Sequence, residues 1–251
     1  MKKFRGFSAV AAVIIVAIVG LLVFATIMIN NNSEKSADRY NAIYEASDDN
    51  GNIADHVKGD KEAPVLVFEY ADYQCPGCAS INPYVNKAVE ELDGKLAVVY
   101  RSMLLSYHQN ATAAASAAEA AGLQGYWKAY ADKLFSTQAD WEDADGSERT
   151  ELFNKYFEEV SGGKGDLEQF KKDIASARVS KKISFDMDIA KKIDVGGTPA
   201  FYVDGQLISW SAKNGGKVYL DNGKTVSWDS ARSGSAFTEL LKEIVETKLS
   251  E

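Results

Sequence analysis

The feature that most constrains this chain is a cysteine pair, Cys75 and Cys78, that lies between a predicted strand and a predicted helix. Residues 65–70 form a largely apolar run typical of a buried strand. A helical stretch follows the cysteines to about residue 92, and residues 96–104 form a second apolar run. A strand, a helix and a strand in this order predict a parallel strand pair joined by a right-handed crossover.

The spacing of Cys75 and Cys78 suits a disulfide that opens and closes. Side chains three residues apart on a helical turn share a face, and their separation then falls within disulfide geometry. So small a ring contributes little stability through loop entropy. The chain has no other cysteine, whereas a disulfide-stabilised scaffold would carry more. The pair is therefore better explained by redox chemistry than by a structural role.

The position of Cys75 at a helix start predicts a reactive thiolate. Pro76 suits the first helical position, where its missing N–H is not needed. Free N–H groups and the helix dipole should stabilise the Cys75 thiolate and lower its pKa. The thiolate is the species that attacks a disulfide. Cys78, one turn further on, is expected to be less exposed and to resolve the mixed disulfide.

Two other interpretations of the cysteine pair are weaker. A structural zinc site usually needs four ligands, and the only histidines, His56 and His108, lie far apart without paired spacing. The sequence therefore predicts no metal and no other cofactor. A peptide-binding or chaperone module with a vestigial redox pair is the second alternative, and the intact cysteine pair argues against it.

The amino terminus predicts a membrane anchor. Residues 7–29 are 23 residues without a charge, long enough to span a bilayer as a helix. Basic residues lie in the preceding segment, 1–6, which places that tail in the cytoplasm and the remaining chain outside. A cleaved signal peptide is the alternative, although its apolar region would be shorter. Residues 30–62 are polar and are interpreted as a tether.

The net charge of the chain excludes one class of partner. The chain of 251 residues carries a net charge of −8, which becomes −11 once the +3 of residues 1–29 is set aside. An acidic ectodomain argues against nucleic acid as a partner. The membrane is instead contacted through the N-terminal helix.

The remaining pattern predicts further helices and strands of an α/β domain over residues 63–251. Residues 110–177 have a helical pattern, and residues 113–121 within them are rich in alanine. Gly-Gly-Thr-Pro then ends a further helix and leads into a hairpin turned by Asp204-Gly205. The other predicted elements are a helix over 180–193, strands over 200–203 and 206–210, an extra hairpin over 218–220 and 225–228, and a final helix over 235–249.

Three segments, residues 68–78, 101–111 and 197–205, resemble the DsbA-like thiol–disulfide oxidoreductases of the thioredoxin superfamily. They occur in the family's order, and the similarity extends over about residues 64–244. The resemblance implies a thioredoxin-like fold with an inserted helical domain. It also implies that Cys75 is the nucleophile and Cys78 the resolving thiol.

Further roles are carried over from the same resemblance. Thr198 and Pro199 would form a cis-proline loop that faces the disulfide and, with Pro76 and Gly77, binds substrate; an ordinary trans proline is the alternative. Glu69 would lie beneath the cysteines with a raised pKa and relay the proton of Cys78. A partly solvated glutamate at a strand end is the alternative for Glu69.

The resemblance also implies partners, with one departure from the family pattern. Substrates would be secreted or membrane proteins with free thiols, and a quinone-linked thiol oxidase in the membrane would re-oxidise the pair. The dipeptide between the cysteines is Pro76-Gly77, whereas strongly oxidising members carry Pro-His. Because an imidazole partner for the thiolate is missing, a disulfide reductase or isomerase of the same fold stays an alternative to a disulfide donor.

Overall fold

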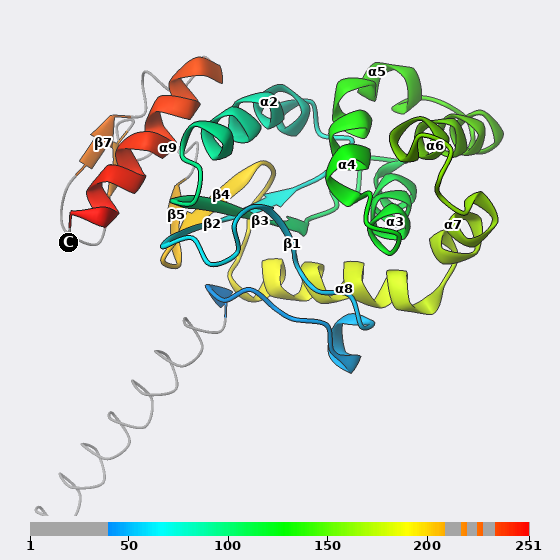
Figure 1. The fold of residues 1–251 in the computed structure, drawn as a ribbon, viewed down its shortest axis with the longest axis horizontal. Coiled ribbons are helices and arrows are strands. Elements are labelled where there is room, and N and C mark those ends of the chain that lie inside the picture. Colours follow the sequence, from blue (N-terminus) through cyan, green and yellow to red (C-terminus); the bar gives the residue numbers. More distant parts are fainter. Residues whose placement is uncertain (1–39, 209–216, 220–224, 228–233, 251) are drawn as a thin grey trace, which may run out of the picture. The chain divides into compact units, whose positions relative to one another are not determined.

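A computed structural model describes residues 40–208, 217–219, 225–227 and 234–250 (Figure 1). The chain divides into two compact units, residues 1–42 and 43–251, and the second holds the β-sheet and the helices around it. The predicted cytoplasmic tail and membrane anchor lie outside the described residues. Among the residues that are described, no helix is long and apolar enough to cross a membrane.

The centre of the domain is a mixed β-sheet. Its five described strands, in spatial order, are β1 (His56–Gly59), β3 (Leu96–Ser102), β2 (Val65–Ala71), β4 (Ala200–Val203) and β5 (Gln206–Ile208). The two central strands, β2 and β3, are parallel, and the other pairs are antiparallel. The predicted parallel pair joined by a helix is confirmed, since the helix that follows the cysteines links β2 to β3.

The N-terminal border of the domain differs from the prediction. The expected tether over residues 30–62 contains β1, which pairs with β3, and the compact unit begins at Ile43. Asn50 and Ile53 are also buried. The prediction of a tether was wrong for residues 43–62, because this short polar segment gains its structure from backbone pairing with a distant strand and not from its own hydrophobic pattern.

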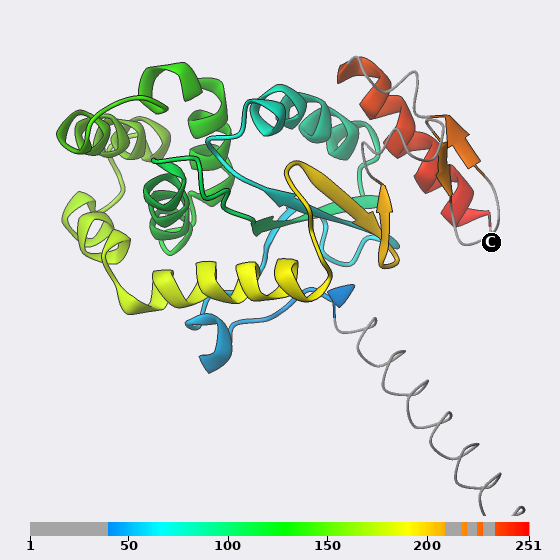
Figure 2. The ribbon, with the colours of Figure 1, turned by 180° about the vertical axis from the view of Figure 1, so that it is seen from behind.

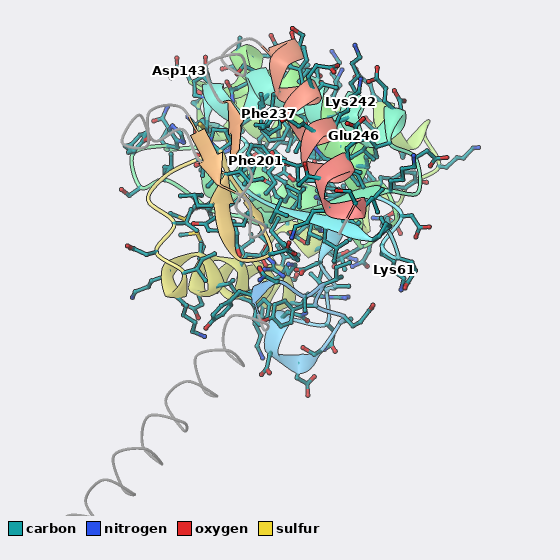
Figure 3. All side chains as sticks on the ribbon, turned by 90° about the vertical axis from the view of Figure 1, so that its left-hand side faces the viewer. Lys61, Asp143, Phe201, Phe237, Lys242 and Glu246 are labelled. Atoms are coloured by element: carbon teal, nitrogen blue, oxygen red, sulfur yellow. The ribbon has the colours of Figure 1, made fainter. Side chains whose placement is uncertain are left out.

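Helices cover both faces of the sheet (Figures 1 and 2). Helices α2 (Pro76–Glu91) and α9 (Gly234–Leu249) pack against each other on one face, and α8 (Ala177–Lys192) contacts β3 on the other. Phe237 of α9 points at Phe201 of β4, with ring centroids 4.6 Å apart (Figure 3). The final helix thereby closes the apolar core beneath α2.

The predicted helical insertion is present between β3 and α8. It consists of α3 (Ala111–Gly122), α4 (Trp127–Ser136), α5 (Gln138–Trp141), α6 (Gly146–Ser161) and α7 (Leu167–Ile174). The alanines of α3 are almost all buried, and their small side chains let neighbouring helices approach closely. The short helix α5 was not predicted as a separate element.

Local capping explains where several of these helices begin and end. The Asp145 side chain accepts hydrogen bonds from the backbone N–H groups of Ser147 and Glu148 at the start of α6. Ser176 caps the start of α8 in the same way. Gly162 ends α6 with a φ of 59°, a conformation that costs glycine little.

Both predicted hairpins are present. Asp204 and Gly205 have positive φ angles of 48° and 74° and join β4 to β5 in the tight turn that such residues favour. Strand β6 (Lys217–Tyr219) pairs antiparallel with β7 (Thr225–Ser227). The predicted turn of this second hairpin, at Asn222-Gly223, lies outside the described residues.

Candidate redox site

The cysteine pair lies at the start of α2, directly after β2. Cys75 is the N-cap residue with extended backbone angles, and Pro76 is the first residue of the helix. The Cys75 side chain is 8% exposed and that of Cys78 is fully buried. The order of exposure expected from the sequence is therefore confirmed.

The loop before β4 faces the cysteines. The Thr198–Pro199 peptide bond is cis, as predicted, and Cys75 Sγ lies 3.4 Å from the Thr198 carbonyl oxygen. A Cβ atom added to Gly77 would lie 3.2 Å from Pro199 Cδ. The proline therefore packs closely over the dipeptide between the cysteines, although the two segments are more than 120 residues apart in sequence.

The surroundings of Cys75 favour its thiolate. A hydrogen bond from the Cys78 thiol makes the largest contribution, and burial opposes it. The neighbouring Thr198 and hydrogen bonds from the backbone N–H groups of Cys78 and Gly77 add to the effect. Together they lower the pKa of Cys75 to about 5, in the direction expected for a cysteine at a helix start.

Cys78 has the opposite electrostatic environment. Burial raises the pKa of its thiol well above the ordinary value, and the neighbouring Cys75 and Glu69 raise it further. The Cys78 proton is therefore retained unless a nearby base accepts it.

Glu69 lies where the sequence placed it, beneath the pair in β2. Its side chain is fully buried, so the alternative of a partly solvated strand-end glutamate is wrong. Burial raises the pKa of its carboxyl group, and Lys58 opposes this effect only in part. Within the described part of the chain, neither carboxylate oxygen accepts a hydrogen bond.

Sequence reasoning missed two charged groups at this site. Lys58 of β1 is fully buried, with Nζ 3.8 Å from Glu69 Oε2; its segment had been interpreted as tether. Asp72, between β2 and the cysteines, accepts a hydrogen bond from the Gln74 backbone N–H and lies 2.8 Å from His108 Nδ1. An aspartate whose side chain accepts a hydrogen bond from the backbone two residues later is a recognisable turn signal, so Asp72 could have been found from the sequence. No local signal marked Lys58.

A cavity of about 450 Å³ opens beside Cys75, and its wall is mostly apolar. Gly77, Thr198 and Pro199 line it, together with Leu207 of β5, whose side chain is 47% exposed. Pro76 is exposed and is not among the lining residues. The structure therefore brings together three of the four predicted substrate-binding residues around one cavity.

No cluster of three metal-binding side chains occurs among the residues described. The two histidines pair separately with carboxylates, since His56 lies 2.8 Å from Glu119 and His108 the same distance from Asp72. Neither pair includes a cysteine.

A low-pKa cysteine at a helix start, a buried partner thiol and a cis-proline in the facing loop define a thiol–disulfide oxidoreductase of thioredoxin-like fold. Comparison with known proteins agrees: residues 51–216 match the family described as Thioredoxin. The chain belongs to this family, and within it to the DsbA-like type.

Relatives of known sequence fall into two groups. "Probable disulfide bond formation protein D" of Bacillus anthracis is 30% identical over 82% of this chain and 90% of its own length. A protein named "Na(+)/H(+) antiporter NhaA 1" of Salinispora arenicola is 36% identical over 61% of this chain. This chain spans only 22% of that antiporter's length.

Solved structures of other proteins share the fold. BdbD from Bacillus subtilis, in its oxidised form, matches with a TM-score of 0.57 and 21% identity over 84% of this chain and 98% of its own. A thioredoxin-like oxidoreductase from Silicibacter pomeroyi matches with a TM-score of 0.55 and 24% identity over 80% of this chain and 97% of its own.

Proposed function

We propose that this chain oxidises pairs of protein thiols to disulfides outside the cytoplasm. The observation that carries the proposal is the contrast between the two thiols, since the pKa of Cys75 is lowered to about 5 while that of the buried Cys78 is raised. A thiolate at Cys75 stabilises the reduced pair, and a stabilised reduced form makes the disulfide form an oxidant.

The reaction proceeds through a mixed disulfide. A substrate thiolate attacks Cys75 Sγ and breaks the Cys75–Cys78 bond, and Cys78 leaves with the electron pair and takes a proton from Glu69. A second substrate thiolate then attacks the substrate sulfur and expels Cys75. The low pKa of Cys75 makes it a good leaving group. Two electrons pass from the substrate to the cysteine pair.

Substrate binding is assigned to the cavity beside Cys75. An extended peptide would lie along the Thr198–Pro199 segment, with an apolar side chain in the cavity near Leu207. This position would bring a substrate thiol to Cys75, the more exposed of the two cysteines.

The cellular setting is part of the proposal. Residues 7–29 would anchor the chain in the membrane, with residues 1–6 in the cytoplasm and a tether that ends near Ile43. Substrates would be secreted or membrane proteins with free thiols. A quinone-linked thiol oxidase in the membrane would accept electrons from the reduced pair.

The test is the reduction potential of the Cys75–Cys78 pair, measured on the full chain in detergent by equilibration with glutathione buffers. We expect a potential well above about −270 mV, the value for thioredoxin. A potential at or below that value would contradict a disulfide donor. Cys75→Ser is the control and should show no exchange.

A disulfide reductase of the same fold is the second candidate. The observation that favours it is Gly77, which leaves the thiolate without the imidazole partner found in strongly oxidising relatives. The same measurement decides between the two, because a reductase requires the lower potential.

A further inference from the structure

A second carboxylate is connected to the pair formed by Lys58 and Glu69. Lys58 Nζ donates a hydrogen bond of 2.5 Å to Asn82 Oδ1. Asn82 lies on α2, one turn after Cys78, and its Nδ2 donates to Asp132 Oδ1 at 2.9 Å. Asp132 belongs to α4, in the helical insertion. A continuous chain of polar contacts thus joins the insertion to the redox site.

Asp132 is held in its ionised form. Burial raises the pKa of Asp132, but hydrogen bonds from Asn82 and Asn86 and the charges of Lys58 and Lys128 outweigh burial, so the pKa is lowered. Its side chain is 29% exposed and lines a cavity of about 400 Å³ between α2 and α4. The negative charge is therefore permanent near neutral pH.

The charges on Lys58 and Asp132 determine which protonation state of Glu69 is favoured. Lys58 carries one positive charge and Asp132 one negative charge. Lys128 also lies 3.1 Å from Asp132, but its side chain is 57% exposed, so water screens its charge. When Glu69 is protonated, the buried Lys58 charge and the Asp132 charge balance; when Glu69 is ionised, one negative charge is in excess. The protein interior penalises an uncompensated charge, so Asp132 favours the protonated form of Glu69.

We infer that Asp132 is a positioning residue of the redox site, which supplies the counter-charge to Lys58 and so leaves Glu69 free to exchange a proton with Cys78. The inference rests on the proposed redox function. The contact with Asn82 also fixes the Lys58 ammonium group, which lies 3.8 Å from Glu69. The charge on Asp132 contributes to the raised pKa of Glu69.

The other groups around Glu69 do not replace Asp132. Tyr73 and Tyr100 interact electrostatically with Glu69, but burial raises the pKa of both phenols well above 10, so they are neutral near pH 7. Phe201, opposite Glu69 on β4, has no ionisable group. Cys78 is the reacting thiol itself.

The step affected is the closure of the cysteine pair. The Cys78 thiol transfers its proton to the Glu69 carboxylate, and Cys78 sulfur attacks Cys75 Sγ in the mixed disulfide. The Cys75–Cys78 bond forms, the Cys75–partner bond breaks, and the partner leaves as a thiolate with the electron pair. Removal of the Asp132 charge should lower the pKa of Glu69, so that a larger fraction of Glu69 is ionised and able to accept the Cys78 proton at acidic pH.

The test uses the full chain with Cys75 joined to glutathione, and it follows the rate of glutathione release from pH 5 to pH 9. For Asp132→Asn, which retains an oxygen for Asn82 and Asn86, we expect the profile to move to lower pH by about half a unit, or about threefold faster release at a given acidic pH. In a Glu69→Gln background the same change should move the profile much less.

Asp188→Asn is the matched control, since Asp188 is an exposed aspartate of α8, and its profile should equal that of the unmodified chain. Asp132→Ser serves as a second neutral variant. A lowered melting temperature without a moved profile would overturn the inference, as would an equal displacement with and without Glu69. Failure of the unmodified chain to form or resolve the mixed disulfide would instead contradict the proposed function.

Discussion

The two faces of the sheet both bury charged side chains, but they satisfy these charges differently. Side chains alternate between faces along a strand, so Glu69 points toward α2 while its neighbour Tyr70 points toward α8. On the α8 face, Asp55 accepts hydrogen bonds from Arg101 at 2.7 Å and from Lys182 at 3.0 Å. On the α2 face, the carboxylate of Glu69 accepts no hydrogen bond from any described residue.

The pKa shifts of the two carboxyl groups follow this difference. Burial raises the pKa of Asp55, but Lys182 and Arg101 outweigh it, so the pKa is lowered and the carboxylate stays ionised. For Glu69 burial prevails over Lys58, and the pKa is raised. A fully hydrogen-bonded ion pair fixes geometry, whereas an incompletely paired carboxyl group can gain or lose a proton. Asp55 therefore stays ionised and fixes the packing of α8, whereas Glu69 has the properties expected of the proposed proton acceptor.

Lys182→Met should produce the largest effect and should affect only stability. The substitution leaves the carboxylates of Asp55 and Asp186 buried without their ammonium partner, which lies 2.6 Å from Asp186. We expect the free energy of unfolding to fall by about 3–5 kcal/mol, measured by urea denaturation. The reduction potential should not change, and a clear change would refute the separation of the two faces.

The free energy of unfolding of the reduced protein should depend on pH because of Cys75, at the start of α2. The folded pKa of Cys75, about 5, is below its unfolded value, so the folded state binds fewer protons and stability rises with pH. Between pH 5 and pH 7 we expect a gain of on the order of 2–3 kcal/mol in the free energy of unfolding. The gain is lost as pH falls through 5.

The check is urea denaturation of the reduced chain and of Cys75→Ser over this pH range. The serine variant lacks the ionising thiol and should not show the gain. Equal pH dependence in both proteins would mean that other groups cause it.

Glu69→Gln should slow closure of the cysteine pair with little change in the free energy of unfolding. Gln cannot accept the Cys78 proton, so closure of the cysteine pair should slow by roughly tenfold or more at neutral pH. Because Lys58 and Asp132 still balance each other, the free energy of unfolding should change by less than about 1 kcal/mol. Stopped-flow detection of glutathione release measures the rate of closure, and urea denaturation measures the stability. A large loss of stability with an unaltered rate of release would assign Glu69 a structural role.

Lys87→Gln should have the smallest effect. Lys87 and Glu91 form an ion pair of 3.6 Å on α2, with side chains 57% and 37% exposed. Exposed pairs four residues apart on a helix contribute about 0.3–0.5 kcal/mol, and urea denaturation should show no more than this. A larger loss of stability would indicate that burial does not explain why charged groups inside the domain affect stability more than those on its surface.

Local patterns in the sequence predicted the parts of the site that are local in the chain. The strand that carries Glu69, the helix that begins at Pro76 and the segment with Pro199 were all recognised from short runs of residues. The charge partners were not, because Lys58 and Asp132 are 24 and 50 residues away from Asn82, the residue that connects them. Such pairings depend on strand order and helix packing, which spacing alone does not encode.

The complete burial of Cys78 has a practical consequence for labelling. A bulky maleimide added to the folded, reduced chain can approach Cys75 from the adjoining cavity, whereas Cys78 presents no surface to it. One fluorophore or spin label per molecule should therefore attach, without any cysteine being introduced or removed. The unmodified chain thus offers a site-specific spectroscopic reporter at the mouth of the cavity beside Cys75.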